Sequence, residues 1–324
     1  MRKILSVFVG ANLFALSIVI SSYSTFTKDD AGTSTAQFLK LGAGARAAGM
    51  GDVFVGISDD ATAVYWNPAG LNQIENKSVS LMHAFWFEDI FYDWMSYVHP
   101  IEDIGTFGVG VQYLSYGDIL ETDETGLEGS NFKPKDLATT LSYARKLSLR
   151  GEAEAISIGI NLKYISSKIK EKASAFAVDV GSQIKMKDEK LKIGLVIQNV
   201  GTKMEFIDER EPLPTNIKLG GAYSIKDNWL MAVDVNAPID NEIHIGIGTE
   251  YSCKLDLRLN SMQYENDLAV MFRAGYNTRT RKIDGFKGIT GGLGVGYRNY
   301  NLDYAFVPFG DLGNTHRISM TINF

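Results

Sequence analysis

The residues that come closest to a known chemistry lie near the start of the chain, where small residues are spaced as in a nucleotide-binding loop. Gly42, Gly44 and Ala47 satisfy the pattern G-x-G-x-x-G/A, and Asp59 or Asp60 follows at about the distance of a ribose-binding acid. Such a loop needs a buried parallel strand before it, an amphipathic helix after it and further βαβ units. The flanking stretches "TAQFLKL" and "VFVGISDD" supply neither, so the spacing does not favour a dinucleotide site.

Other candidate catalytic groups are isolated in the sequence. The four histidines stand singly, no His/Cys spacing suits a metal, and G-x-S-x-G does not occur. Ser167 and Lys170 spell S-x-x-K, but the surrounding pattern places them at the end of a hairpin and not on a helix beside a pocket. We therefore expect no enzymatic activity, no cofactor and no metal site. A net charge of −6 gives no reason to expect a nucleic-acid partner.

The amino terminus has the pattern of a secretory signal. Arg2 and Lys3 precede a mostly apolar run over residues 4–20, and small residues then suit cleavage after Ser24. A transmembrane anchor is the weaker interpretation, because polar residues interrupt the run and no basic stop follows it. We predict a signal peptide over residues 1–24 and hence an exported protein. Its single cysteine, Cys253, cannot form an intramolecular disulfide.

From about residue 78 onward, apolar residues recur with a period of two. In one example Phe107, Val109 and Val111 alternate with Gly108 and Gly110. A soluble sandwich also alternates, but its solvent face is charged, whereas the second face here is rich in Gly, Ala, Ser, Thr and Asn. Strands that are apolar outside and polar inside are typical of a transmembrane β-barrel. We expect Val111 to face lipid and Gly110 to face the lumen.

The last ten residues, "THRISMTINF", alternate in the same way and end on an aromatic residue. His316, Ile318 and Met320 share one face with the final Phe324. A terminal strand of this kind resembles the signal that the outer-membrane barrel assembly machinery recognises. We predict that Phe324 serves as the membrane-assembly signal and that this machinery is a partner.

Counting the alternating segments gives fifteen candidate strands between residues 78 and 324. Single-chain bacterial barrels have an even number, so one segment has to be left out. The long connections at 117–136, 201–214 and 276–287 all fall outside the cell only if 255–263 is omitted. We predict an all-β fold, a 14-stranded antiparallel transmembrane β-barrel over residues 78–324, with a periplasmic extension at 253–266.

Residues 25–77, which precede the first strand, are predicted to form an N-terminal lumenal hatch. Side chains of a fourteen-stranded wall cannot fill so wide a lumen, and the glycines and alanines of 43–51 allow close backbone packing inside it. Asn67 and Pro68 then fix a turn, because the proline ring locks φ and restricts the preceding residue. We interpret this stretch as a plug.

The charged residues of the hatch are its candidate gating residues. Arg46 is expected to pair with a wall carboxylate such as Asp179 or Glu250. Asp59 and Asp60 are consecutive, so in an extended chain they would point in opposite directions and could not share a proton. We expect them to bond the hatch backbone or cations of the wall; a calcium-binding or gating role is the alternative.

The stretch "FLKLGAGARAAGMGDVFVGISDDATAVYWNPAGL" resembles the amino-terminal signature of the PorV/PorQ family of FadL-like outer-membrane proteins. Later pieces, including "FAVDVG", "FRAGYN" and "LDYAFVPFGDLGNTHRISM", occur in the order expected of that family. The resemblance implies a fourteen-stranded barrel, a hatch that carries the turn Asn67-Pro68-Ala69, and no enzymatic activity. Members near PorV serve type IX secretion as carriers of exported cargo, whereas FadL itself admits hydrophobic molecules. The chain departs from the compact family pattern at 253–266, and its external loops look short for a cargo receptor.

Two functions follow from the barrel and the resemblance. The first is a FadL-like outer-membrane barrel that binds or passes hydrophobic ligands, either lipid or fatty-acid-like, with Arg46, Asp59, Asp60, Asn67, Pro68 and Ala69 holding or gating the hatch. The alternative is a PorV-like carrier or accessory protein of type IX secretion, with exported protein cargo as its partner. A purely structural barrel would need neither a pocket nor a partner surface. Outer-membrane lipid is a partner in every case.

Overall fold

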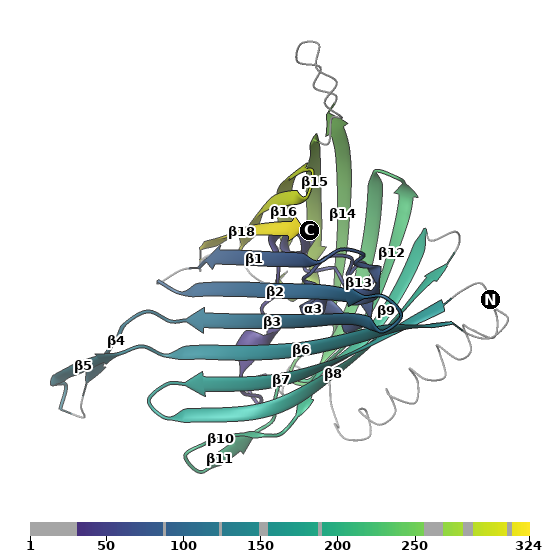
Figure 1. The fold of residues 1–324 in the computed structure, drawn as a ribbon. Helices are drawn as coiled ribbons and strands as arrows, with labels where there is room; N and C mark the ends of the chain where they lie inside the picture. The colour runs from purple at the N-terminus through teal and green to yellow at the C-terminus, as the bar shows by residue number, and fades with distance from the viewer. Residues whose placement is uncertain are drawn as a thin grey trace.

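In a computed structural model of the chain, fourteen antiparallel strands form a closed barrel (Figure 1). The structure describes residues 31–86, 89–122, 125–148, 155–186, 190–255, 268–280, 288–309 and 313–324. The barrel strands are β1 (Ser78–Phe85), β2 (Phe91–Ile101), β3 (Gly105–Ser115), β6 (Lys135–Ser148), β7 (Ala155–Lys168), β8 (Lys172–Met186), β9 (Leu191–Gly201), β12 (Asn216–Lys226), β13 (Trp229–Pro238), β14 (His244–Leu255), β15 (Leu268–Asn277), β16 (Ile289–Tyr297), β17 (Tyr300–Pro308) and β18 (Asn314–Asn323). Each strand pairs with its neighbours around the ring, and β1 pairs with β18 to close it. The predicted fold class is confirmed.

The period of two places the apolar side chains on the outside of the barrel. On β3, Phe107 and Val109 are exposed on the outward face, while Gly108, Gly110 and Gln112 are buried on the inward face. The same arrangement recurs around the ring, where many large apolar side chains are exposed. An outer surface of this kind is stable against lipid but not against water. The predicted assignment of alternating residues to the outward face and the lumenal face is therefore confirmed.

Replacing Val111 by arginine is expected to destabilise the barrel by about 2 to 4 kcal/mol, because the charge would lie on the lipid face near the middle of β3. Unfolding of the protein from lipid vesicles by denaturant measures this difference. Ile207→Arg is the matched control, because Ile207 lies on an external hairpin and is 80% exposed. Equal losses in the two variants would contradict the orientation of β3.

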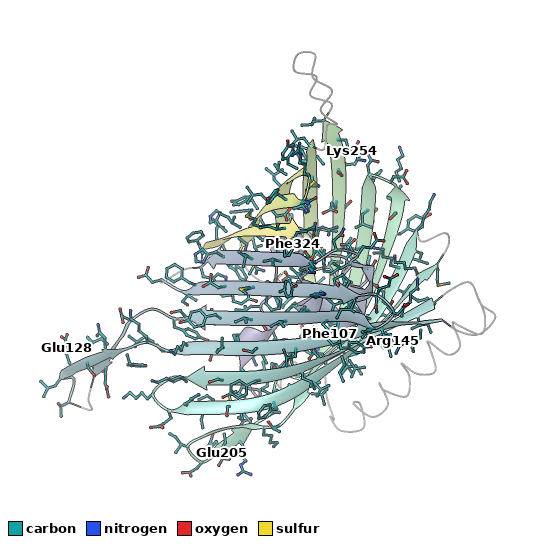
Figure 2. The ribbon with its side chains drawn as sticks, viewed as in Figure 1. Phe107, Glu128, Arg145, Glu205, Lys254 and Phe324 are labelled. Atoms are coloured by element: carbon teal, nitrogen blue, oxygen red, sulfur yellow. The ribbon has the colours of Figure 1, made fainter. Side chains whose placement is uncertain are left out.

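Two connections that the sequence analysis treated as loops contain short hairpins. One is formed by β4 (Ile119–Thr122) and β5 (Glu128–Phe132), the other by β10 (Met204–Phe206) and β11 (Glu209–Glu211). Figure 2 shows Glu128 and Glu205 on these hairpins, beyond the ends of the barrel strands. Both belong to connections at the predicted external end. Strands this short carry too few alternating residues to be recognised in the sequence. Of the omitted segment 255–263, Leu255 ends β14 and the remainder lies outside the described residues.

The described part of the hatch, residues 31–77, lies against the inward face of the barrel wall. It is built from short turns of helix, namely η2 (Gln37–Lys40), α2 (Ala45–Gly49), α3 (Ala63–Trp66) and η3 (Pro68–Gln73), and a further turn, η4 (Thr278–Thr280), follows β15. Side chains such as Phe54, Ile57 and Leu71 are completely buried. η3 packs on β6, β7 and β8, whereas α2 packs on β15 to β18. The hatch thus bridges opposite parts of the wall. The predicted signal peptide, residues 1–24, lies outside the described residues.

None of the helices in the described part of the chain has the length and apolar character needed to cross a membrane.

Candidate functional site

The best-connected charged group of the hatch is Arg46, on α2. Its guanidinium donates to both carboxylate oxygens of Glu250, with Nε–Oε2 at 2.8 Å and Nη2–Oε1 at 2.9 Å. Nη1 also reaches Asp59 at 2.7 Å and Asp60 at 3.2 Å. The expected pairing with a wall carboxylate is thus found with Glu250. The other candidate, Asp179, is instead paired with Lys163 at 2.7 Å, so that suggestion was wrong.

The Arg46 cluster continues along the wall. Arg273 of β15 binds Glu250 at 2.6 Å and Asp303 of β17 at 2.7 Å. Lys192 of β9 lies 3.4 Å from Asp59. A bidentate arginine–carboxylate pair fixes both partners in one geometry. The cluster therefore ties α2 to strands on separate sides of the lumen.

The two consecutive aspartates do not point in opposite directions as expected. Both approach Arg46, because the chain bends here and Thr62 donates its backbone N–H to Asp60 at 2.9 Å. Burial alone would raise the pKa of Asp59, but Arg46 and Lys192 more than offset it and hold that pKa well below its usual value. Burial raises the pKa of Asp60, and the neighbouring charge of Asp59 adds to this effect. Asp59 therefore carries the negative charge that Arg46 and Lys192 hold.

The turn Asn67-Pro68-Ala69 forms a second attachment of the hatch. Asn67 caps η3 by accepting the N–H of Ala69 at 3.1 Å, and its amide donates to the carbonyl of Ser182 on β8 at 3.1 Å. Gly181 faces this turn, and a Cβ at that position would lie 2.2 Å from the Asn67 side-chain oxygen. Only glycine leaves room for such an approach. The turn is thus held by the wall as well as by its own cap.

The stretch that spells the nucleotide-binding pattern is packed against protein. α2 has five residues, and the N–H of Ala45 donates to Ser319 of the wall at 3.1 Å. Gly44 has a φ of +85°, and Ala47 is buried. No phosphate site is formed at this helix start. The small residues serve close packing, as the sequence analysis favoured.

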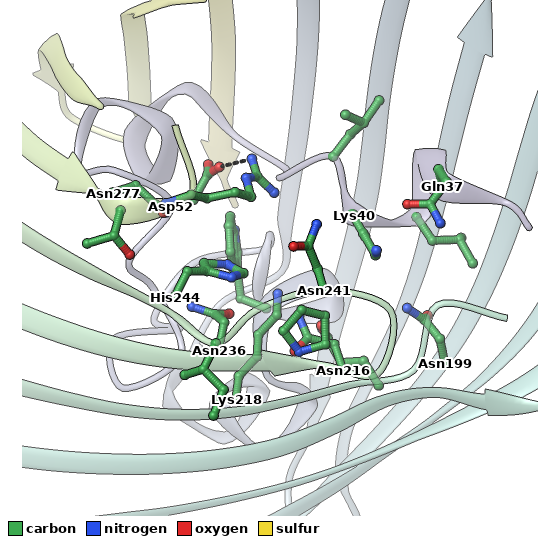
Figure 3. Close-up of a pocket in the computed structure, with 18 of the residues that line it drawn as sticks. Gln37, Lys40, Asp52, Asn199, Asn216, Lys218, Asn236, Asn241, His244 and Asn277 are labelled. Carbon is green, nitrogen blue, oxygen red and sulfur yellow. Dashed lines mark hydrogen bonds and ion pairs between the residues drawn. The ribbon is translucent and has the colours of Figure 1, made fainter. Parts of the chain in front are cut away.

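A cavity of about 600 Å³ lies on the external side of the hatch, away from the Arg46 cluster (Figure 3). Its lining includes Trp86, Asn241 and Phe309 from connections at the predicted external end, together with Leu39 and Leu41 of the hatch. We name it the outer pocket. The rings of Trp86 and Phe309 are 5.6 Å apart. The hatch therefore forms the floor of a pocket that lies between it and the external rim.

The outer pocket combines apolar and polar groups. Amide side chains line much of it, from Gln37, Gln198, Asn199, Asn216, Asn236, Asn241 and Asn277. Lys218 lies over the rings of Tyr65 and Trp66, with Nζ 5.4 and 5.0 Å from their centroids. Such a lining suits an amphipathic molecule, because rings and aliphatic groups take apolar parts while amides orient polar ones.

Several of these residues were missed in the sequence. Three of the missed residues are charged and face the lumen from barrel strands, namely Lys218, Arg273 and Asp303. In each strand the charged residue interrupts a lumen-facing row of small residues. That interruption is a usable signal, although it does not identify the partner. A smaller cavity of about 340 Å³ borders the Arg46 cluster on the opposite side of the hatch. Within the described residues, no group of three or more His, Cys, Asp and Glu side chains could hold a metal ion.

The remaining candidates lie apart from the hatch. Phe324 follows β18 with its side chain exposed, and its N–H donates to the Lys77 carbonyl at 2.8 Å. Its role in assembly stays a prediction. Ser167 is at the end of β7, and Lys170 lies in the turn before β8, where it binds Glu121 at 2.5 Å. The two residues are thus at a hairpin end, as expected.

Comparison with protein families gives one match. The model of the family described as type IX secretion system protein PorV matches residues 25–242, which is more than half of the chain. The matched range includes the predicted hatch and the first nine barrel strands. No curated protein matches the chain.

Solved structures share the barrel at low sequence identity. The toluene transporter TodX of Pseudomonas putida is 14% identical, with a TM-score of 0.57 over 87% of this chain and 98% of that one. The toluene transporter TbuX of Ralstonia pickettii is 11% identical, with a TM-score of 0.53 over the same shares. A FadL homologue of Pseudomonas aeruginosa is 12% identical, with a TM-score of 0.52, again over 87% and 98%. At these identities the likeness establishes the fold.

Proposed function

The chain belongs to the family of the type IX secretion system protein PorV and is an outer-membrane β-barrel, and from this premise we propose that it binds or passes hydrophobic ligands. The observation that carries the proposal is the outer pocket, which the hatch closes from below and which contains both rings and amides. Pockets of this volume typically bind small molecules. Solved structures with the same fold include proteins described as toluene transporters. The proposed ligands are lipid-like or fatty-acid-like, and the protein acts without catalysis.

The hatch has a defined part in this function. Arg46, Asp59 and Asp60 hold it to the wall, and Asn67, Pro68 and Ala69 hold its second end. A ligand that enters from outside meets the outer pocket first and cannot proceed while these contacts persist. Every barrel strand in the described chain is paired on both sides. Passage therefore requires the hatch to move, and these six residues are its gating residues.

Trp86→Ala is expected to weaken binding of a long-chain hydrophobic probe about tenfold, because the substitution removes part of the apolar lining of the outer pocket. Displacement of a fluorescent fatty-acid analogue from the detergent-solubilised protein measures the change. Trp229→Ala is the matched control, since Trp229 lies on the outward face at the other end of the barrel. An unchanged affinity in Trp86→Ala, or an equal loss in both variants, would exclude the outer pocket as the binding site.

The alternative, a PorV-like carrier or accessory protein of type IX secretion, is favoured by the two external hairpins. Ile119, Leu120 and Ile207 are exposed on them, beyond the lipid-facing wall. Exposed apolar groups above a membrane suit contact with a partner protein. Retention of purified exported cargo by the wild type, lost when the β10–β11 hairpin is shortened, would support this function. Binding of the hydrophobic probe would be unaffected by that change.

A further inference from the structure

One carboxylate on the barrel strands differs from all the others. The strands carry six Asp and Glu residues in the described part of the chain, and five of them face the lumen, namely Asp136, Asp179, Asp234, Glu250 and Asp303. Asp93 on β2 faces outward, where its side chain is 45% exposed. A charged group facing lipid is costly and is usually retained for a function.

The position of Asp93 is defined by its neighbours. It lies directly opposite His83 of β1, and the two side chains meet with Nδ1 and Oδ1 2.6 Å apart. The His83 ring contacts Phe85 edge-on at 4.4 Å and stacks with Phe91 at 5.7 Å. Phe85 and Phe91 end their strands at the external side. The carboxylate therefore lies close beneath the outer headgroup region, where aromatic residues form a girdle.

His83 occupies only one oxygen of this carboxylate. Within the described residues, Oδ2 of Asp93 has no hydrogen-bond partner. An ionised carboxylate is an acceptor without donors, so the free oxygen calls for a donor, and a cationic one forms the stronger bond. An anionic group would instead be repelled. The charge at this place thus selects an ammonium group.

An apolar groove of about 500 Å³ adjoins the pair on the same outward face. Its lining includes Leu81, Met95, Val111, Ile318 and Met320, together with the pair itself and Tyr113, which lies opposite Asp93 on β3. Leu81 pairs with Met95 and Met320, one outward position further from the external end than His83. The groove therefore extends from the carboxylate toward the membrane interior, which is the arrangement of headgroup and acyl chain in an outer-leaflet lipid.

We propose that this groove binds one lipid molecule whose headgroup carries an ammonium with N–H donors. The ammonium donates to Oδ2 of Asp93, His83 holds the carboxylate in place, and an acyl chain lies along Leu81, Met95 and Val111. The occupant is a lipid because the groove opens toward the acyl chains of the bilayer and has a polar group at its outer end only. This site is on the outer wall and is independent of the outer pocket.

Native mass spectrometry of the whole protein in detergent tests the proposal with two lipids of identical acyl chains. Phosphatidylethanolamine has N–H donors, and phosphatidylcholine has the same net charge without them. We expect the wild type to retain the first about tenfold more, as one charge-assisted hydrogen bond would give. Asp93→Asn should reduce this preference to about twofold or less, whereas Val233→Thr, on the outward face of β13 across the barrel, should keep it. Equal retention by the wild type, or an undiminished preference in Asp93→Asn, would overturn the proposal.

Two further arms keep the test decisive if Asp93→Asn assembles poorly. Leu81→Trp fills the groove but keeps the carboxylate, and it should lower retention of phosphatidylethanolamine severalfold; unchanged retention would refute the groove as the site. A photo-reactive residue at position 95 should form adducts with lipid in native outer membranes. Adducts with a protein at that position would show that a partner chain, and not a lipid, covers the groove.

Discussion

Deleting Thr33 to Gly70 is expected to leave a barrel that still assembles but leaks. The deleted range contains α2, α3 and the Asn67-Pro68-Ala69 turn, whereas the hydrogen-bond ladders of the wall run from β1 to β18 without it. A fourteen-stranded lumen without its hatch is an aqueous channel. Conductance in planar bilayers should rise from near background to that of an open pore. Binding of the hydrophobic probe should fall, because Leu39 and Leu41 line the outer pocket.

The control for this deletion is the removal of residues 207–208, the exposed turn of the β10–β11 hairpin, which should not change conductance. Heating before gel electrophoresis reports whether each variant is a folded barrel, since folded barrels migrate faster when unheated. A folded, hatchless barrel with the conductance and probe binding of the wild type would show that the hatch is not a plug. Nucleotide binding by the intact protein would support the interpretation of Gly42, Gly44 and Ala47 as a nucleotide-binding loop.

Arg46→Met is expected to release the hatch without disrupting the wall. The substitution leaves Glu250, Asp59 and Asp60 without their shared cation, and breaking a largely buried ion pair costs about 3 to 5 kcal/mol. A loss of about 3 kcal/mol from the free energy that favours the closed hatch would raise its open population about 100-fold. Single-channel recording measures that population as the fraction of time spent open. Arg46→Lys should show a smaller effect, because it keeps the charge and loses the bidentate geometry.

Arg210→Met is the matched control for the Arg46 cluster. Arg210 binds Glu205 at 2.6 Å on the β10–β11 hairpin, where both side chains are largely exposed. An exposed pair contributes at most about 1 kcal/mol, so gating should not change. Combining Arg46→Met with Asp60→Asn should restore part of the closed population, because within the described residues Arg46 is the only cation paired with Asp60, whereas Glu250 keeps Arg273. If Arg46→Met opened no more often than Arg210→Met, the cluster would not be what closes the hatch.

The strands were predictable because one rule applies to each of them separately. Alternation assigns every residue of β3 or β18 to lipid or lumen. The even strand number then requires one segment to be left out, and the lengths of the connections select 255–263. The identity of side-chain partners follows no such rule. Arg46 and Glu250 are separated by more than two hundred residues and meet only because the barrel is closed. Sequence reasoning therefore offered two carboxylates and could not choose between them.

The character of the outer pocket was less predictable for a related reason. Its lining comes from the hatch and from connections at one end of the barrel, including Asn241 and Phe309, which carry no periodic pattern. The opposed directions expected for Asp59 and Asp60 assumed an extended chain, and Ser58 with a φ of +38° begins a bend instead. Local conformation outside regular strands is set by packing, and in the hatch that packing involves the whole wall.

The seam between β1 and β18 also constrains the order in which the molecule is built. Ser78 at the start of the wall pairs with Asn323 at its end, so the ring cannot close until the last strand has been delivered. Contacts between such distant parts of a chain form late. The hatch precedes β1 and ends up enclosed, so it has to take its place while the sheet is still open. Because η3 rests on β6, β7 and β8 and α2 rests on β15 to β18, the enclosed segment gains its contacts with the wall in two stages, and the second stage needs the last four strands.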